Sequence, residues 1–182
     1  MGEGCHALGK IKLLILDVDG VLTNGIVFLN ETGTESKAFH LRDGHGIKLL
    51  QKCGIGIVLL SGRYSEATLR RAEELGIKEV YQGIVDKLPL YEKVLRDKGL
   101  EDDEVAYMGD DLMDLPLLRR AGFGATVADG IEEAKEVAEY VATKKGGEGA
   151  VREVIELILK SQGKWQEVTA RYFQCMPNSI LL

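Results

Sequence analysis

The stretch KLLILDVDG, residues 12–20, joins an apolar run to a polar turn, and it decides how the rest of the chain is interpreted. Residues 12–16 have the length of a strand and are apolar after Lys12, which is typical of a buried strand. Asp17 and Asp19 follow directly, and Gly20 allows the chain to turn tightly. The segment therefore predicts a strand whose carboxyl end presents two carboxylates.

Two further apolar runs also end in polar residues. Residues 56–60 precede Ser61-Gly62-Arg63, and residues 105–108 precede Gly109-Asp110-Asp111, which Asp114 follows. Lys87 is a fourth polar position and opens a predicted helix. Because ligands bind beyond the carboxyl ends of strands in open parallel sheets, these four polar islands predict one shared site.

Between the islands, strand-length apolar runs alternate with segments of helical periodicity. The helices are expected at 43–53, 65–75, 88–98, 111–121, 131–137 and 151–159, and the other strands at 79–81, 123–127 and 140–142. This alternation predicts an α/β fold with a doubly wound, Rossmann-like parallel sheet.

A predicted β-hairpin interrupts the alternation directly after the first island. Residues 26–29 and 35–41 flank the polar turn 30–33, which contains a glycine. At about seventeen residues, the hairpin is far below the roughly 50 residues of an independent domain. We therefore expect one domain over residues 10–162, with the hairpin at about 25–41 as a flap, cap or assembly surface, and a flexible C-terminal tail over 163–182.

The bulk properties of the chain exclude several classes of protein. Its 182 residues are 45% hydrophobic and 29% charged, with a net charge of -6, which argues against broad binding to nucleic acids or anionic membranes. Cys5, Cys53 and Cys175 are scattered and lack metal-binding spacing, which favours reduced thiols and a cytoplasmic protein. No apolar run reaches the roughly 20 residues of a membrane span.

The first island has the residue types that phosphoryl transfer needs. Asp17 can attack phosphorus to form an aspartyl-phosphate, and Asp19 can protonate the leaving oxygen and later activate water. Attack by one anion on another needs a cation, and Mg²⁺ prefers carboxylate oxygens. For this motif alone, a polar strand-to-loop turn without catalytic function is the structural alternative.

The other islands supply complementary groups. Asp110 is expected to complete the metal site, with Asp114 in a supporting role. Asp111 lies in the first turn of a predicted helix, where helix capping and support of the metal both remain open. Ser61 can donate to a phosphoryl oxygen and Lys87 can neutralise phosphate, although a lone Ser-Gly turn or lysine is also common on surfaces.

Together, the four islands resemble the motifs of the haloacid dehalogenase (HAD) superfamily of aspartate-nucleophile phosphohydrolases, over roughly residues 10–162. The resemblance implies a HAD-like fold in which Asp17 is the nucleophile and Asp19 the general acid and base. It implies that Ser61 and Lys87 bind phosphate. It also implies Mg²⁺ held by Asp17, the backbone carbonyl of Asp19, and Asp110.

Longer stretches resemble one family within that superfamily, the 3-deoxy-D-manno-octulosonate 8-phosphate phosphatases. They are DVDGVLTNG at 17–25, KAFHLRDGHG at 37–46, SGR at 61–63, YQG at 81–83 and GGEGAVRE at 146–153. The resemblance implies a small-cap enzyme of lipopolysaccharide synthesis, with no separate cap domain. It also implies homotetramers in which hairpins join at the centre and neighbouring subunits close each other's active sites.

The same resemblance implies a set of substrate-binding residues. They are Asp19, His40, Leu41, Arg42, Asp43, Gly44, Lys48, Arg63, Arg71 and Lys87. Arginine suits the sugar carboxylate because it can bind a carboxylate through two parallel hydrogen bonds. Arg71 is also compatible with a solvated helix surface, and a transition-metal site at His40 and His45 is disfavoured because the acidic clusters already provide a magnesium site.

Two positions depart from the family pattern. Asn24 stands where the family often has aspartate, which puts a contact near the hairpin in question. Glu148 stands where the family often has arginine, which puts a cationic role of the glycine-rich tail in question. Neither departure touches the hydrolytic motifs.

Other functions compete with this interpretation. The nearest is a nonulosonate 9-phosphate phosphatase, in which an acidic residue tends to replace the arginine of Ser-Gly-Arg, so that Arg63 favours the octulosonate. A phospho-aspartate receiver also uses acids, a hydroxyl, a lysine and magnesium, but Asp19, the hairpin and the tail argue against it. A non-catalytic scaffold is disfavoured by the complete set of motif residues.

Overall fold

A parallel six-stranded sheet forms the centre of the computed structural model, which describes residues 8–173. The strand order is β5-β4-β1-β6-β7-β8, and every neighbouring pair is parallel. The strands are β1 (Leu13–Leu16), β4 (Gly56–Leu60), β5 (Glu79–Tyr81), β6 (Val105–Met108), β7 (Phe123–Thr126) and β8 (Tyr140–Val141). The predicted parallel sheet is confirmed.

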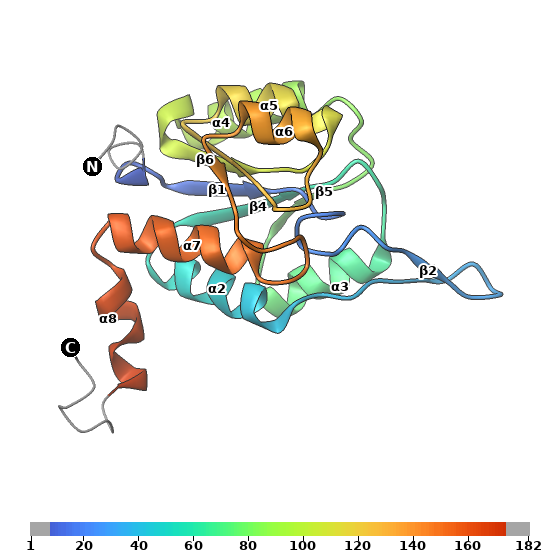
Figure 1. Ribbon diagram of the computed structural model, residues 1–182, viewed down its shortest axis with the longest axis horizontal. Coiled ribbons are helices and arrows are strands. Elements are labelled where there is room, and N and C mark those ends of the chain that lie inside the picture. Colours follow the sequence, from blue (N-terminus) through green and yellow to red (C-terminus); the bar gives the residue numbers. More distant parts are fainter. Residues whose placement is uncertain (1–7, 174–182) are drawn as a thin grey trace.

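Helices cover both faces of the sheet (Figure 1). One layer consists of α2 (Leu41–Lys52), α3 (Glu66–Leu75) and α7 (Ala150–Ser161), and the other of α4 (Lys87–Lys98), α5 (Leu115–Arg120) and α6 (Glu132–Val137). Within β1, Leu14 and Leu16 pack into the first layer, whereas Leu13 and Ile15 pack into the second. The central strands are buried on both sides, which explains why they are continuously apolar rather than alternating.

The hairpin is present, but its strands are shorter than expected. Strands β2 (Phe28–Leu29) and β3 (Glu35–Ser36) pair antiparallel and extend away from the body of the protein (Figure 1). The side chain of Asn30 closes the turn by accepting hydrogen bonds from the backbone of Thr32 and Thr34. The expected continuation of the second strand to Leu41 is wrong, because Leu41 is already the first residue of α2.

The predicted helix at 111–121 is divided into two elements. A short 3-10 helix, η2 (Leu112–Asp114), precedes α5, which carries Pro116 in its first turn. The carboxylate of Asp114 accepts hydrogen bonds from the backbone N–H groups of Asp110 and Asp111. This side chain ties back the start of the segment, and the regular helix begins only after it.

The segment after Gly163, where a flexible tail was expected, forms two short helices that end at Tyr172. Helix α8 (Trp165–Thr169) is followed by a 3-10 helix, η3 (Ala170–Tyr172). Trp165 and Val168 pack against the core, and the guanidinium of Arg152 lies 5.1 Å from the centre of the Trp165 ring. The i, i+3 spacing of these apolar residues places them on one face of the helix. The remainder of the expected tail, 174–182, lies outside the described residues.

The strand order places a topological switch point beside β1. From β1 the chain proceeds to β4 and β5, and it then returns to β6 on the other side of β1. The carboxyl ends of β1, β4 and β6 therefore meet where a ligand is expected in an open α/β sheet. Among residues 8–173, the helices are too short or too polar to traverse a lipid bilayer.

Candidate active site

A cavity of about 230 Å³ lies at the carboxyl ends of β1, β4 and β6, and we call it the strand-end cavity. Its lining residues are Asp17, Asp19, Ser61, Gly62, Arg63, Asp110, Asp111, Met113 and Asp114. Three of the four polar islands thus line a single cavity. The fourth, Lys87, is the first residue of α4 and contacts two of the lining residues, Asp17 and Asp114.

Lys87 is a buried cation that joins two of the islands. Its Nζ lies 2.7 Å from Asp17 Oδ1 and 2.6 Å from Asp114 Oδ1, and 1% of the residue is exposed. Burial alone would lower the pKa of Lys87, but the two carboxylates raise it above the ordinary lysine value. The surface-lysine alternative is therefore excluded, and the ammonium group stands beside the carboxylate expected to attack phosphorus.

Asp114 is a hub of hydrogen bonds beneath the cavity. One oxygen accepts from the backbone N–H groups of Asp110 and Asp111 at 2.9 and 3.1 Å. The other accepts from Lys87 Nζ and, at 2.5 Å, from the hydroxyl of Tyr107. With all these donors satisfied, Asp114 is suited to fixing the loop after β6 and the position of Lys87.

The carboxylates at the cavity repel one another. Burial raises the pKa of Asp17 to about 7, although Lys87 opposes that shift. Burial, reinforced by the charges of Asp17 and Asp114, raises the pKa of Asp110 to about 8. Such shifts arise when carboxylates lie together in a poorly solvated site, and a bound cation would reverse them.

The residues fit a hard divalent cation. Asp17, Asp110 and Asp114 each offer a carboxylate oxygen, and these oxygens lie within 4.8 Å of one another. Asp110 Oδ1 is buried and finds no hydrogen-bond partner among the described residues, whereas both oxygens of Asp114 are engaged. Asp17 and Asp110 are therefore better placed as metal ligands than Asp114, and oxygen-only ligands suit Mg²⁺.

Asp19 is held by a lysine from the base of the hairpin. Lys37 Nζ lies 2.5 Å from Asp19 Oδ1 and 3.3 Å from Glu35 Oε1. Glu35 Oε2 in turn accepts from Arg63 Nη2 at 2.7 Å. The hairpin thus contributes a chain of alternating charges to the edge of the strand-end cavity.

Gly20 is required by the close approach of two islands. A Cβ atom at this position would lie 2.0 Å from Asp110 Oδ2, and the φ angle of 92° favours glycine independently. Any larger residue would push the Asp110 carboxylate out of place. The glycine that the sequence associated with a tight turn therefore also permits the carboxylate cluster to assemble.

Ser61 and Asp111 occupy different positions relative to the chemistry. Ser61 is 1% exposed at the end of β4, lines the cavity, and accepts from the backbone N–H of Arg63. Asp111 is exposed and caps η2 by accepting from the backbone N–H of Leu112 at 2.7 Å. Helix capping and support of the metal were both left open for Asp111, and the structure shows a contact for capping.

The remaining substrate-binding residues expected from the sequence surround the start of α2. They are His40, Leu41, Arg42, Asp43, Gly44, Lys48 and Arg71, and they do not line the strand-end cavity. Asp43 is 1% exposed and accepts from the backbone N–H of Arg152, tying α2 to α7. Arg71 is largely buried, bonds to Glu74 and lies over the ring of Phe39, so its solvated-surface alternative does not hold.

The histidines and the two unusual positions have local partners. His45 pairs with Tyr172 and Arg152, and the one cluster of potential metal ligands found within residues 8–173 contains neither His40 nor His45. Asn24 accepts from the backbone N–H of Ile26 at the start of the hairpin, a role that an aspartate can also fill. Glu148 lines a different hollow of about 530 Å³ together with Arg42.

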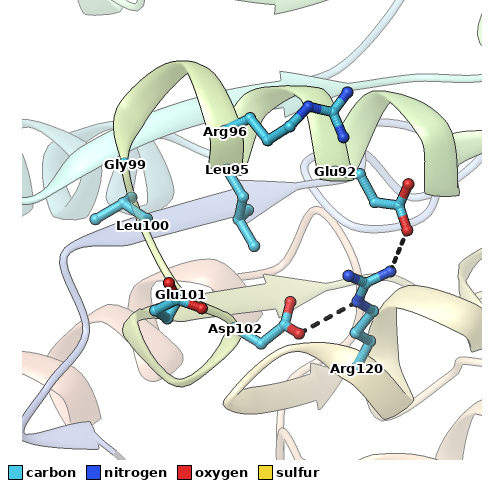
Figure 2. A pocket seen from close by; sticks show the side chains of 8 residues that line it. All are labelled: Glu92, Leu95, Arg96, Gly99, Leu100, Glu101, Asp102 and Arg120. Carbon is cyan, nitrogen blue, oxygen red and sulfur yellow. Dashed lines mark hydrogen bonds and ion pairs between the residues drawn. The ribbon is translucent and has the colours of Figure 1, made fainter.

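A polar groove of about 470 Å³ lies at the opposite end of β6 (Figure 2). There Arg120 reaches from α5 to Glu92 on α4, at 2.5 Å, and to Asp102, at 3.2 Å. Asp102 belongs to η1 (Asp102–Glu104), which leads into the amino end of β6. Both carboxylates form ion pairs with Arg120, and these pairs link α5 to α4 and η1. We therefore do not assign a second catalytic centre to this groove.

Three residues of this site were not predicted from the sequence. From the hairpin, Lys37 contacts Asp19 and Glu35 contacts Arg63. Tyr107 reaches Asp114 from the interior of β6. Tyr107 could have been suspected, because a tyrosine in a fully buried strand needs a partner for its hydroxyl. For Lys37 and Glu35 there was no comparable signal, since charged residues are ordinary in a hairpin.

Comparisons with known proteins agree with this geometry. A family model described as haloacid dehalogenase-like hydrolase matches residues 76–155. The 3-deoxy-D-manno-octulosonate 8-phosphate phosphatase KdsC of Yersinia pestis is 43% identical over 160 residues, which cover 88% of this chain and 86% of that protein. The chain belongs to this phosphatase family.

Solved structures of family members share the fold of this phosphatase. The Moraxella catarrhalis enzyme, determined in complex with magnesium, phosphate and KDO, is 44% identical and superposes with a TM-score of 0.92, covering 94% of this chain and 99% of that one. A cobalt-bound relative from Haemophilus influenzae is 39% identical with a TM-score of 0.86, covering 92% and 98%. The protein is thus a HAD-type phosphoric monoester hydrolase, which excludes the receiver and scaffold alternatives.

Proposed function

We propose that this phosphatase hydrolyses 3-deoxy-D-manno-octulosonate 8-phosphate to the free sugar acid and inorganic phosphate, with Mg²⁺ as its cofactor. The observation that carries the proposal is the presence of Arg63 in the same cavity as Asp17 and Asp19. A guanidinium beside a phosphoryl-transfer centre suits a substrate that carries both a carboxylate and a phosphate. Membership of the family supports the same substrate, a cytoplasmic location and a place in lipopolysaccharide synthesis.

In the first chemical step, the Asp17 carboxylate attacks phosphorus and the bond from phosphorus to the sugar oxygen breaks. Asp19 gives its proton to that oxygen, so that the sugar leaves as an alcohol. In the second step, water attacks the phosphorus of the aspartyl-phosphate while Asp19 takes up a proton from it. The phosphoryl bond to Asp17 breaks, and phosphate and the free carboxylate are restored.

The surrounding residues hold the phosphoryl group and its charge. Ser61 donates to a phosphoryl oxygen, and Lys87, at 2.7 Å from Asp17, offsets negative charge next to the nucleophile. When bound, Mg²⁺ offsets the charge between the attacking carboxylate and the phosphoryl oxygens, and its proposed ligands are Asp17, the backbone carbonyl of Asp19, and Asp110. Asp114 keeps Lys87 and the loop carrying Asp110 in place.

A substrate panel tests this proposal. With Mg²⁺, we expect kcat/KM for the octulosonate 8-phosphate to exceed that for a nonulosonate 9-phosphate, and we expect EDTA to abolish both activities.

Arg63→Met should raise KM for the octulosonate by about 10- to 100-fold, because a charge-assisted hydrogen bond contributes about 1.5–3 kcal/mol. Its kinetics with p-nitrophenyl phosphate, which has no carboxylate, should stay unchanged. A wild-type preference for the nonulosonate would overturn the assignment.

We propose in addition that the enzyme is a homotetramer assembled through its hairpins. The hairpin exposes Ile26, Phe28 and Leu29 by 53%, 60% and 69%, an apolar surface that is costly to leave in water. Most of the residues expected to bind the sugar lie outside the strand-end cavity of their own subunit; they are His40, Leu41, Arg42, Asp43, Gly44, Lys48 and Arg71. A neighbouring subunit that covers the cavity would bring recognition and chemistry together.

The assembly is tested by replacing Phe28 and Leu29 together with aspartate. We expect light scattering to detect a tetramer for the wild type and smaller species for the variant, since buried charges destabilise an apolar interface. KM for the sugar phosphate should rise by about tenfold or more in the variant, the change expected when roughly 1.4 kcal/mol of binding is lost. Val141→Asp, at a 40% exposed position on the outer strand β8, is the matched control. A wild-type monomer, or a dissociated variant with unchanged KM, would contradict the proposal.

A further inference from the structure

We propose that Lys37 is a positioning residue that aims Asp19 at the leaving oxygen of the substrate. The inference deepens the proposed function, because it concerns the protonation step of that reaction. It rests on how the two oxygens of the Asp19 carboxylate differ in their surroundings. Lys37 reaches this carboxylate from the hairpin, 18 residues further along the chain.

One oxygen of Asp19 is tied and the other is free. Lys37 Nζ lies 2.5 Å from Oδ1, whereas Oδ2 is buried and has no hydrogen-bond partner within the described part of the chain. A general acid needs this asymmetry, because one oxygen must fix the side chain while the other exchanges the proton with the substrate and later with water. Because Lys37 holds Oδ1, the Asp19 side chain cannot rotate freely.

Lys37 is itself held firmly in place. Its side chain is 1% exposed, so an ammonium group there needs carboxylate partners to compensate for lost hydration. Asp19 and Glu35 supply that compensation at 2.5 and 3.3 Å. If Lys37 turned away from Asp19, it would leave both a buried cation and an unpaired carboxylate behind.

The same chain of charges reaches the residue proposed to bind the sugar carboxylate. Glu35 accepts from Arg63 Nη2 at 2.7 Å while its other oxygen faces Lys37. Two side chains of the hairpin thus connect Asp19 with Arg63. The base of the hairpin positions a reacting group on one side and a recognition group on the other.

A purely structural role for Lys37, such as anchoring the hairpin, predicts a different result from a positioning role. Lost anchoring would lower all activities together, in proportion to the folded fraction. If Asp19 were no longer correctly oriented, the activity would fall mainly for substrates whose leaving group needs a proton. A sugar alkoxide needs that proton, whereas p-nitrophenolate is a weak base and leaves without one.

The experiment compares these two leaving groups in Lys37→Met protein. The ratio of kcat for the sugar phosphate to kcat for p-nitrophenyl phosphate, each measured at saturating substrate, reports leaving-group departure, because lost recognition of the carboxylate raises KM instead. This ratio does not depend on how much protein is folded. We expect the ratio to fall by about 100-fold, within the 10²–10⁴ range of general acid catalysis. Lys37→Arg, which keeps the cation, should recover at least about tenfold of that loss. Lys98→Met, which removes an exposed ion pair to Glu79, should leave the ratio unchanged.

A fall of both activities by the same factor in Lys37→Met protein would overturn the inference. If that variant does not fold, Glu35→Gln weakens the second support of Lys37 and should lower the ratio in the same direction; an unchanged ratio there also counts against the proposal. Failure of wild-type protein to hydrolyse the octulosonate 8-phosphate would refute the proposed substrate instead. The ratio would then be measured with the alkyl phosphate of the panel that the wild type hydrolyses fastest.

Discussion

Asp17→Asn protein is expected to lose about 10⁴- to 10⁶-fold in kcat, the range seen when a nucleophile is removed from a covalent mechanism. The amide cannot form the acyl-phosphate, so the residual rate comes only from the remaining phosphate-binding and acid–base groups. The loss should be similar for the sugar phosphate and for p-nitrophenyl phosphate, because both must be attacked by the same carboxylate. This uniform loss distinguishes the nucleophile from Lys37.

The same substitution should leave the protein as stable as before, or make it more stable. The pKa of Asp17 in the folded protein is raised to about 7, mainly by burial, from an ordinary value of 3.8. A carboxyl whose folded pKa is raised contributes stability at low pH, and this contribution is lost as the pH rises towards 7. At pH 8 the charged Asp17 therefore opposes folding, and a neutral asparagine removes that opposition.

Single-turnover kinetics with Mg²⁺, and thermal melting at pH 8 without added metal, would check the two statements in turn. Asp97→Asn is a matched control, since Asp97 is exposed on α4 and 3.9 Å from Lys93. It should change neither rate nor melting temperature. Activity of Asp17→Asn within tenfold of the wild type would refute the assigned nucleophile.

Lys87→Met is expected to cost both activity and stability. Removing one member of a buried ion pair costs about 3–5 kcal/mol, because the remaining charges stay buried without compensation. Here Asp17 and Asp114 both lose a partner, at 2.7 and 2.6 Å. Catalysis should fall by about 100-fold or more, as for loss of an electrostatic contact to developing charge.

The loss of stability should depend on pH. In the wild type the pKa of Asp17 is about 7 and that of Asp110 about 8, and Lys87 lowers both. Removing Lys87 should therefore raise both pKa values further. Groups with raised folded pKa values destabilise the protein increasingly as the pH rises through those values. The deficit of Lys87→Met should therefore be larger at pH 8.5 than at pH 6, where the carboxyls take up protons.

Urea unfolding at these two pH values measures the effect, with Lys98→Met as the control for loss of an exposed lysine. Mg²⁺ should recover part of the deficit at pH 8.5, because it offsets the same carboxylates. An equal deficit at both pH values would show that Lys87 acts through packing alone. Full activity in the variant would exclude its role in phosphate binding.

The strands and the central polar groups were predictable because their signals are local. A strand buried on both faces must be apolar throughout, and LLIL and VAYM satisfy this without reference to the rest of the molecule. In a parallel sheet, the polar residues that follow such strands all lie at the carboxyl edge of the sheet. Asp17, Ser61 and Asp110 could therefore be placed together from their positions in the chain.

Contacts that depend on the path of the hairpin were not predictable in this way. A polar hairpin can point in many directions, and nothing in the spacing of Glu35 and Lys37 indicates that they fold back onto Asp19. Residues 165–169 were missed for a related reason, since a short helix derives its stability from packing and not from its own propensity. The family resemblance added roles for these regions but not their contacts.

By itself, the sequence predicted an α/β fold with Asp17 and Asp19 at the end of its first strand, because burial and strand topology place those residues at the carboxyl edge of the sheet. Its resemblance to a known family predicted the phosphohydrolase. Only the tertiary structure decided how each carboxylate is used. Asp114 is satisfied by four donors, Asp110 retains a free buried oxygen, and Asp19 is tied at Oδ1 alone. These differences arise from partners distant in sequence, and the energies of buried charges depend on the distances that folding sets.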